Sequence, residues 1–241
     1  MIRLYQTTAL NIGELIELDK NPSHHLIRVL RARAGSVVTL FNGDGHEYLA
    51  ELVDDNPKHC HLRIKQRLKV ENESPLRITL LQGISRGDRM DTAIQKSIEL
   101  GVHAIIPVDC QCSGSSVKGE RADKKHHHWQ QIVISACEQS GRCYIPPVSS
   151  ISSFSDAINL DNSSSKIILD PQAHLTFNQL QKLEGDIYLL IGPEGGFSDD
   201  EIRQACNSGF TAISLGPRIL RTETAGPASI AIAQTLWGDL G

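Results

Sequence analysis

The sequence lacks any long hydrophobic run, and this absence excludes two classes of protein. No apolar segment approaches the length that crosses a membrane. The N-terminus shows no extended apolar stretch and soon reaches Glu14, Glu17 and Asp19, so no secretory signal is visible. The six cysteines are scattered through predicted strands and helices, as is typical of reduced thiols. We therefore expect a cytoplasmic protein without a membrane partner.

The sequence also lacks the residue spacing of a metal site. Cys110 and Cys112 have no companion pair at the distance that zinc sites use. His126, His127 and His128 are consecutive, and consecutive side chains on a helix point in different directions. We therefore expect no bound metal.

Two common nucleotide motifs are missing as well. A dinucleotide site would place G-x-G-x-x-G after the first α/β strand, but the sequence there is Gly83-Ile84-Ser85-Arg86-Gly87-Asp88. A P-loop needs Lys-Ser/Thr after its glycines, whereas Gly196 is followed by Phe197, Ser198 and the acidic run 199–201. Three carboxylates would repel a polyphosphate. The sequence therefore favours a neutral or cationic ligand.

Composition is that of an ordinary globular protein, with 40% hydrophobic and 22% charged residues in 241. The net charge of −4 argues against a generic nucleic-acid coat. Basic residues nevertheless cluster, and phosphate contacts depend on such local patches. One cluster joins His24 and His25 to Arg28, Arg31 and Arg33, and a second alternates along Arg63, Lys65, Arg67 and Lys69. The second cluster could be either a solvated face or an RNA-binding surface, and the sequence leaves both interpretations open.

The first part of the chain is predicted to be a small β-barrel. Two strand-like runs, 36–41 and 47–53, flank the turn Asn42-Gly43-Asp44-Gly45 and predict a hairpin. Residues 61–70 alternate apolar with polar, as a half-buried strand does. The segment 71–75 breaks the pattern. We therefore predict a domain of residues 1–73 and a second domain of residues 74–241.

In the second part, strands alternate with helices, which predicts an α/β fold with a mostly parallel sheet. Helical spacing before Gly101 and before Gly141 predicts two helices, and the capping box at Ser198 predicts the start of a third. A last helix is expected over Thr222–Trp237. The predicted strands are Arg77–Gln82, His103–Val108, Lys166–Asp170, Ile187–Ile191 and Ala212–Leu215.

Two glycine-containing segments carry the strongest functional signal. Glycine loop 1 is Ile191-Gly192-Pro193-Glu194-Gly195-Gly196-Phe197, and glycine loop 2 is residues 215–225, Leu215-Gly216-Pro217-Arg218-Ile219-Leu220-Arg221-Thr222-Glu223-Thr224-Ala225. Each leaves an apolar run and enters a helical pattern, and the carboxyl ends of strands are where open α/β sheets bind ligands. Glycine lets the main chain approach a ligand closely. S-adenosylmethionine, with its cationic sulfonium, is such a ligand.

These two loops, with Glu138–Arg142, Gln95–Gly101 and the His25-x-x-Arg28-Val29-Leu30-Arg31 segment, closely resemble the bacterial 16S ribosomal RNA uridine-N3 methyltransferases of the SPOUT class. The resemblance covers nearly the whole chain. It implies a PUA-like N-terminal barrel that binds RNA, and a C-terminal α/β SPOUT domain whose end is tied in a trefoil knot. It also implies S-adenosylmethionine as cofactor, a homodimer, and a uridine in the decoding region of 16S rRNA, within the 30S subunit, as substrate.

The same resemblance assigns residues to roles. It implies cofactor binding by residues of both loops and one neighbouring strand end: Leu169, Ile191, Gly192, Pro193, Glu194, Gly195, Leu215, Gly216, Ile219, Leu220, Arg221, Glu223, Thr224 and Ala225. It places RNA-binding residues mainly in the first domain: Arg3, His25, Arg28, Arg31, Arg33, Arg63, Lys65 and Arg142.

Arg221 and Glu223 are the candidate catalytic residues. A guanidinium near O2 or O4 of uridine would stabilise the negative charge that develops when N3 loses its proton. A carboxylate could accept that proton, and the sequence leaves Glu223 and Glu194 equally open. Arg221 could instead cap a helix or pair with Glu223, and Glu194 could be an ordinary loop carboxylate.

Two local features depart from the family pattern. Pro227 is tolerated in the first helical turn, so we expect the last helix to begin later or to be kinked. Asp170 stands where relatives often carry a basic residue, which leaves its role open. Two other functions also stay open: a catalytically silent rRNA-binding protein of the same fold, and an unrelated α/β enzyme that uses a nucleotide.

Overall fold

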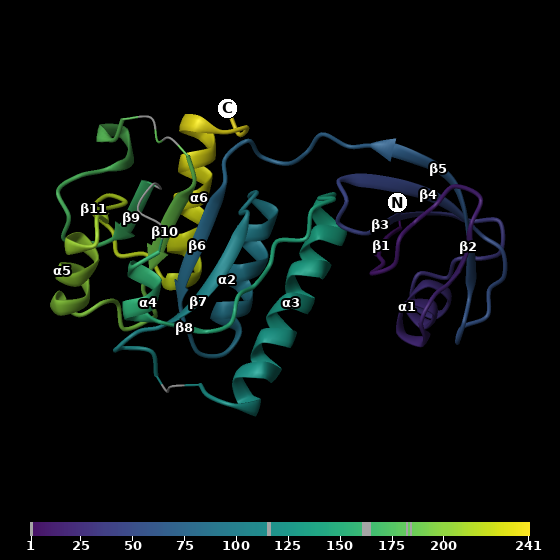
Figure 1. Cartoon of the computed structure of the whole chain (residues 1–241), viewed down its shortest axis with the longest axis horizontal. Coiled ribbons are helices and arrows are strands. Elements are labelled where there is room, and N and C mark those ends of the chain that lie inside the picture. Colours follow the sequence, from purple (N-terminus) through teal and green to yellow (C-terminus); the bar gives the residue numbers. More distant parts are fainter. Residues whose placement is uncertain (1, 115–116, 161–164, 182, 184) are drawn as a thin grey trace. The chain divides into compact units, whose positions relative to one another are not determined.

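The computed structural model divides by its internal contacts into two compact units, coloured along the sequence in Figure 1. Unit 1 consists of residues 1–73 and 137–145, and unit 2 of residues 74–136 and 146–241. The segment 137–145 contains the end of a long helix, and its place in unit 1 is not evident from the sequence. The structure describes residues 2–114, 117–160, 165–181, 183 and 185–241.

Unit 1 is built on a five-stranded sheet in the order β1-β3-β4-β5-β2. The β1–β3 pair is parallel, and the other pairs are antiparallel. The strands are β1 Arg3–Tyr5, β2 Leu15–Glu17, β3 Val37–Phe41, β4 His46–Leu52 and β5 His61–Lys69.

The predicted hairpin and the predicted alternating strand are both present in unit 1. β3 and β4 pair on either side of the Asn42–Gly45 turn, with Leu40 opposite Tyr48. In β5, Leu62 and Ile64 are fully buried, whereas Arg63 and Lys65 are exposed. The alternation therefore separates a core face from a basic face, as a strand period of two requires.

A short helical segment in unit 1 was not predicted. Helix α1 spans Lys20–His24 and continues into a π-helical turn, η1, at His25–Val29. Pro22 falls in the first turn, where a missing N–H leaves no helical hydrogen bond unmade. Just beyond the turn, Arg31 has φ 56°, a left-handed conformation that among the described residues no other non-glycine adopts.

Unit 2 is built on a six-stranded sheet in the order β11-β9-β10-β6-β7-β8, and every pairing in it is parallel. The predicted strands are therefore all present, with ends that differ by one or two residues. The strands are β6 Ile78–Gly83, β7 Ala104–Asp109, β8 Ser152–Ser153, β9 Ser165–Leu169, β10 Ile187–Ile191 and β11 Thr211–Ile213.

The helices of unit 2 begin and end at the predicted signals. Ser198 and Glu201 form the capping box at the start of α5, and Gly101, with φ 86°, follows the end of α2. α2 buries Met90, Ile94 and Ile98, and it packs against α6. The helical elements are α2 Asp88–Glu99, α3 Glu120–Ser140, α4 Phe154–Ile158, η2 Phe177–Gln179, α5 Asp199–Asn207 and α6 Thr222–Trp237.

The expected span of the last helix, Thr222–Trp237, is confirmed, and of the two effects expected of Pro227 the later start is wrong. α6 begins at Thr222 and runs through Pro227. The residue before a proline normally leaves the helical region because its Cβ meets the proline ring, but Gly226 has no Cβ. Pro227 has no N–H, so the helix lacks one main-chain hydrogen bond at this position, but it does not end there.

The sheet order brings both glycine loops to one place. β11, β9 and β10 are neighbours, and their carboxyl ends meet at the same edge because the strands are parallel. Loop 1 follows β10, loop 2 follows β11, and Asp170 follows β9. This is the edge of an α/β sheet at which ligands bind.

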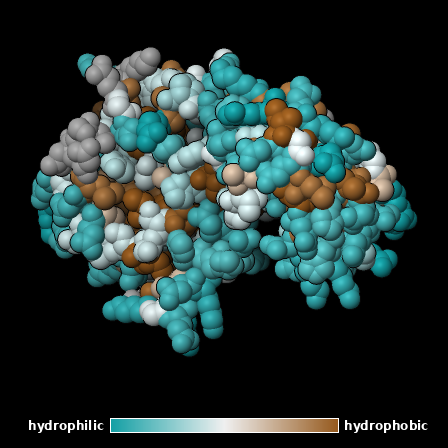
Figure 2. Space-filling view, turned by 45° about the vertical axis from the view of Figure 1, so that its right-hand side comes forward, coloured by the Kyte–Doolittle hydropathy of each residue, from teal (hydrophilic) through white to brown (hydrophobic). Residues whose placement is uncertain are grey.

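Figure 2 shows a mostly polar face with separate apolar patches. Large exposed apolar side chains of unit 2 include Ile219 in loop 2, which is 85% exposed, and Leu236 near the end of α6. Within the described residues, no helix combines the length and the apolar character that a bilayer span needs.

Candidate functional site

A cavity of about 660 Å³ lies between the two glycine loops and the end of β9. Every predicted cofactor residue lines it except Thr224. Thr224 is exposed on the first turn of α6, where its neighbours Thr222, Glu223 and Ala225 line the cavity instead. Successive residues of a helix point about 100° apart, so one of the four must face away. Cofactor binding by Thr224 therefore stays a prediction that the cavity lining does not support.

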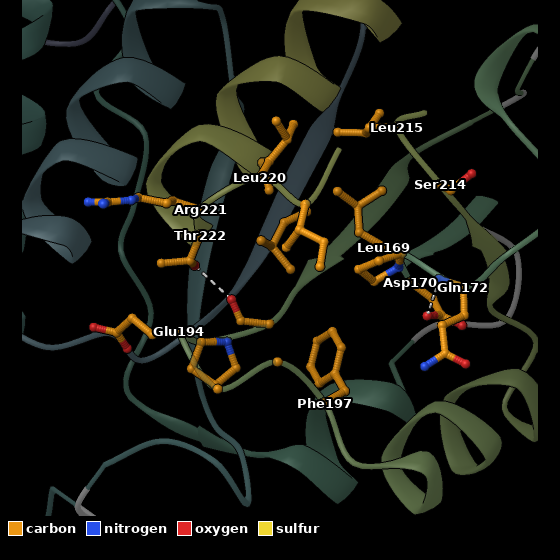
Figure 3. A pocket seen from close by; sticks show the side chains of 18 of the residues that line it. Leu169, Asp170, Gln172, Glu194, Phe197, Ser214, Leu215, Leu220, Arg221 and Thr222 are labelled. Carbon is orange, nitrogen blue, oxygen red and sulfur yellow. Dashed lines mark hydrogen bonds between the residues drawn. The ribbon is translucent and has the colours of Figure 1, made fainter. Parts of the chain in front are cut away.

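The cavity is apolar in the middle and polar at two ends, as Figure 3 shows. Leu169, Leu220 and Phe197 project into the middle. Glu194 and Arg221 lie at one end, and Asp170, Gln172 and Ser214 lie at the other. Such a cavity suits an elongated ligand with polar groups at both ends and a less polar centre.

Loop 1 turns tightly and sits directly on the end of β6. The Gly196 N–H donates to the Pro193 carbonyl at 2.9 Å, which closes a turn. A Cβ on Gly83, the last residue of β6, would lie 2.5 Å from the Pro193 nitrogen. A Cβ on Gly195 would lie 2.8 Å from Cys112 Cβ. Glycine at these two positions is therefore what allows the loop to approach its neighbours so closely.

Thr222 joins the start of α6 to loop 1. Its hydroxyl donates to the Gly192 carbonyl at 2.7 Å, shown as a dashed line in Figure 3, and accepts from Gln82 Nε2 at 2.9 Å. Thr222 is 6% exposed and Gln82 is fully buried. One hydroxyl thus satisfies a carbonyl of loop 1 and a buried amide of β6.

Replacing Thr222 by valine keeps the side-chain shape but leaves the Gly192 carbonyl and the Gln82 amide without this partner. We expect the free energy of unfolding to fall by about 2–4 kcal/mol, because buried polar groups that lose their hydrogen bond bear the full desolvation cost. Urea unfolding measures this. Thr235→Val on the same helix is the control, since Thr235 is exposed and bonds only its own helix at Ala231. Equal stability of the two variants would contradict the role of Thr222.

Glu194 is held from the side of α2. Its Oε1 accepts the Arg86 N–H at 2.8 Å and Arg89 NH1 at 2.7 Å. Burial alone would raise the pKa of Glu194, but these hydrogen bonds and the Arg89 charge outweigh burial and lower it. Glu194 is therefore an ionised carboxylate that already has two donors.

Glu223 is held more loosely and keeps an unused acceptor. Its Oε1 lies 4.0 Å from Arg89 Nε and 4.0 Å from Arg221 NH1. Its Oε2 is buried and has no hydrogen-bond partner among the described residues. The Arg221 side chain is 79% exposed at the cavity wall. The cavity wall thus combines a partly buried carboxylate with an accessible guanidinium.

Two of the predicted RNA-binding residues are buried inside unit 1. The Arg3 side chain is 9% exposed; it pairs with Glu47 at 2.7 Å and donates to the Cys137 and Gly141 carbonyls at 2.6 and 2.9 Å. The Arg142 side chain is 6% exposed and pairs with Glu73 at 2.6 Å. Their charges are committed to contacts within the unit, so the structure gives no support to the prediction that Arg3 and Arg142 bind RNA.

The other predicted RNA-binding residues lie on the surface of unit 1. Lys65 pairs with Glu51 at 2.7 Å and Arg33 with Asp55 at 3.4 Å. Arg63 donates to the Gly13 carbonyl at 3.4 Å. His25, Arg28 and Arg31 are exposed around the η1 turn.

Sequence reasoning missed several residues of the cavity. Thr222, Phe197 and Arg218 lie within the two glycine loops, so the loop motifs could have identified them as cavity residues. Gln172 lies three residues beyond Leu169 in the loop after β9. Arg89 belongs to α2, more than a hundred residues earlier in the chain, and no local pattern connects it to the loops.

Several of the cysteine thiols and histidine rings are buried or contact other groups of the chain. Burial raises the pKa of the Cys137 thiol to about 12 and raises that of Cys110 further. His126 contacts the Val148 carbonyl at 2.6 Å, and His128 contacts Asp91 at 2.8 Å. Across the residues that the structure describes, no group of His, Cys, Asp and Glu could hold a metal ion.

Comparison with known proteins gives matches over the whole chain. The model of the RNA methyltransferase domain matches residues 72–234, and that of the RNA methyltransferase PUA domain matches residues 18–65. The ribosomal RNA small subunit methyltransferase E of Buchnera aphidicola subsp. Schizaphis graminum is 37% identical over 239 residues, which cover 99% of this chain and 97% of that protein.

Two crystal structures match the fold closely. One is a ribosomal RNA small subunit methyltransferase E from Neisseria gonorrhoeae bound to S-adenosyl methionine, with a TM-score of 0.92 and 42% identity over 100% of both chains. The other is a putative methyltransferase from Legionella pneumophila in complex with the same cofactor, with a TM-score of 0.95 and 41% identity over 99% of both chains.

Proposed function

The chain belongs to the ribosomal RNA small subunit methyltransferase E family, and from this premise we propose that it transfers a methyl group from S-adenosylmethionine to N3 of a uridine in 16S rRNA. It has the predicted fold class, a PUA-like part followed by a mostly parallel α/β SPOUT methyltransferase part. The observation that carries the proposal is the cavity built from the two glycine loops, in a chain whose relatives were crystallised with this cofactor.

The residues of the cavity fit S-adenosylmethionine. Glycine main chain at 192, 195 and 216 gives close access to backbone amides and carbonyls. The apolar middle suits an adenine ring, and the Glu223 carboxylate at the wall suits a cationic or hydrogen-bond-donating group. When bound, S-adenosylmethionine supplies an electrophilic methyl group on a sulfonium.

Arg221 has the position for electrostatic catalysis in this proposal. Its guanidinium stands exposed at the cavity wall and pairs only weakly with Glu223, at 4.0 Å. A substrate carbonyl beside it would gain a strong donor as negative charge develops on the pyrimidine. Removal of the N3 proton then becomes more favourable.

Between the two candidate proton acceptors, the contacts favour Glu223. Glu194 Oε1 already accepts two hydrogen bonds, and the lowered pKa of Glu194 makes it a weaker base. Glu223 Oε2 accepts none among the described residues. We therefore assign the N3 proton to Glu223. A catalytically silent protein of this fold is not favoured, because both Arg221 and Glu223 stand at the cavity.

We assign RNA binding to residues 1–73 and methyl transfer to residues 74–241. Arg28 and Arg31 are the leading RNA contacts, because both are exposed and neither pairs with a carboxylate among the described residues. The left-handed conformation at Arg31 presents the second arginine just after the η1 turn. His25, Arg33, Arg63 and Lys65 complete the exposed basic surface of unit 1.

The homodimer is supported by the outer face of α6. Ala228, Ala231, Ile232, Thr235 and Leu236 are partly or fully exposed at the spacing of a single helix face. In the sixteen residues of this helix, Glu223 is the only charged one. An uncharged, largely apolar helix face is typical of a surface that another chain covers. Because α6 starts at the cavity, the second copy would lie close to it.

The proposed substrate is the assembled 30S particle in the cytoplasm, and the experiment compares it with naked 16S rRNA. Both are prepared from a strain that lacks the gene and are incubated with the purified chain and S-adenosylmethionine. Nucleoside analysis by mass spectrometry should show N3-methyluridine, formed at least about tenfold faster on particles, because folded RNA is recognised largely by shape.

Three results would contradict parts of this proposal. Methylation of another atom or base would refute the assignment of uridine N3. Equal rates on particle and transcript would refute the 30S particle as the preferred substrate. RNA binding without any methylated product would favour the silent RNA-binding protein.

A further inference from the structure

Arg89, the second residue of α2, lies beside two of the carboxylates that line the cavity. Its NH1 donates to Glu194 Oε1 at 2.7 Å, and its Nε lies 4.0 Å from Glu223 Oε1. Glu194 belongs to loop 1 and Glu223 to the start of α6, so one side chain connects the two walls. The Arg89 side chain is 45% exposed and lines the same cavity.

The two carboxylates need this arginine to different degrees. Glu194 has a second donor, the Arg86 main-chain N–H at 2.8 Å, so its position does not depend on Arg89 alone. Glu223 has only the two guanidinium groups of Arg89 and Arg221 as charged neighbours in the described part of the chain, each at 4.0 Å. Arg221 is largely exposed, which leaves Arg89 as the better-anchored of the two.

A buried carboxylate oxygen without a donor is unfavourable, and the side chain would turn toward a donor if it were free to do so. Glu223 Oε2 is such an oxygen. An arginine that is itself fixed by a charge-assisted hydrogen bond can hold Glu223 Oε1 in place. The Glu223 carboxylate then keeps its place at the cavity wall although its Oε2 has no donor among the described residues.

We propose that Arg89 is a positioning residue for methyl transfer, which holds the Glu223 carboxylate at the cavity wall, where this carboxylate receives the N3 proton of the uridine. This inference rests on the proposed function, in which Glu223 is the proton acceptor. Arginine suits the task because it offers Nε and NH1 as separate donors in a rigid plane. A lysine offers one point charge and cannot serve two carboxylates in the same way.

The experiment is a double-mutant cycle with Arg89→Ala, Glu223→Gln and the double variant, assayed on 30S particles. We expect Arg89→Ala to lower kcat by about 10–100-fold, with the Kd for S-adenosylmethionine from calorimetry changed less than about threefold. The double variant should be no slower than Glu223→Gln alone, because Arg89 acts through Glu223. Arg89→Lys should recover part of the lost kcat.

The controls separate positioning from loss of charge or of fold. Lys96→Ala removes another cation from α2, one that pairs with Glu99 and with no other carboxylate in the described part of the chain, and should leave kcat unchanged. Thermal unfolding shows whether each variant is folded, and Arg89→Lys provides the test if Arg89→Ala is not.

Two results would overturn the inference alone. In the first, the effects of Arg89→Ala and Glu223→Gln multiply in the double variant, so the two residues act independently. In the second, Arg89→Ala weakens S-adenosylmethionine binding with kcat unchanged, so the arginine only shapes the cofactor loop. A wild-type chain that forms no N3-methyluridine would instead contradict the proposed function itself.

Discussion

Replacing Arg221 by alanine is expected to lower kcat for methyl transfer by at least about 10³-fold while the Kd for S-adenosylmethionine stays within about one order of magnitude. The guanidinium makes no close hydrogen bond in the described structure, and its ion pair with Glu223 spans 4.0 Å. Its removal therefore disturbs the fold little. The variant loses stabilisation of the transition state, in which negative charge spreads over the pyrimidine ring. A positive group at the cavity wall stabilises that charge more than it stabilises the bound substrate.

Single-turnover assays on 30S particles measure the rate, and calorimetry measures cofactor binding. Arg203→Ala on α5 is the control, because Arg203 is exposed and, among the residues that the structure describes, pairs with Asp200 alone. This variant should keep both the rate and the affinity. A parallel loss of rate and of affinity in Arg221→Ala would mean that Arg221 binds the cofactor and has no separate catalytic role.

The fold was largely predictable because its signals are local. The Asn42–Gly45 turn, the alternation along β5 and the capping box at Ser198 each depend on residues a few positions apart. The glycine loops were predictable for the same reason, since each joins an apolar strand to a helical pattern. Parallel pairing then brings these loops together, so the cavity follows from the order of the elements.

Contacts between distant residues were not predictable. A surface arginine and a buried arginine look alike in sequence, and only the fold shows that Arg3 caps the end of α3 and that Arg142 pairs with Glu73. The same holds for Arg89, which reaches loop 1 from α2. The helix through Pro227 shows a further limit, since a neighbouring glycine cancels the usual effect of proline.

Gly83 carries the second large prediction, because the cofactor loop rests directly on it. An alanine Cβ there would lie 2.5 Å from the Pro193 nitrogen, 2.6 Å from Pro193 Cδ and 2.9 Å from the Gly192 carbonyl carbon. These are mostly main-chain atoms, so loop 1 itself must move. We expect Gly83→Ala to weaken S-adenosylmethionine binding by at least about 100-fold and to lower the free energy of unfolding by about 1–3 kcal/mol, as overpacking of a core does.

Gly209→Ala is the control that distinguishes displacement of loop 1 from a general loss of stability. Gly209 has φ 90°, so alanine is strained there, but its Cβ would meet no atom within 4 Å. Its position between α5 and β11 is outside the cavity lining. We expect a loss of about 1 kcal/mol in stability with unchanged cofactor affinity, since the strain is confined to the turn. If Gly83→Ala bound S-adenosylmethionine with the affinity of the wild type, the close contact between loop 1 and Gly83 would not be required for cofactor binding.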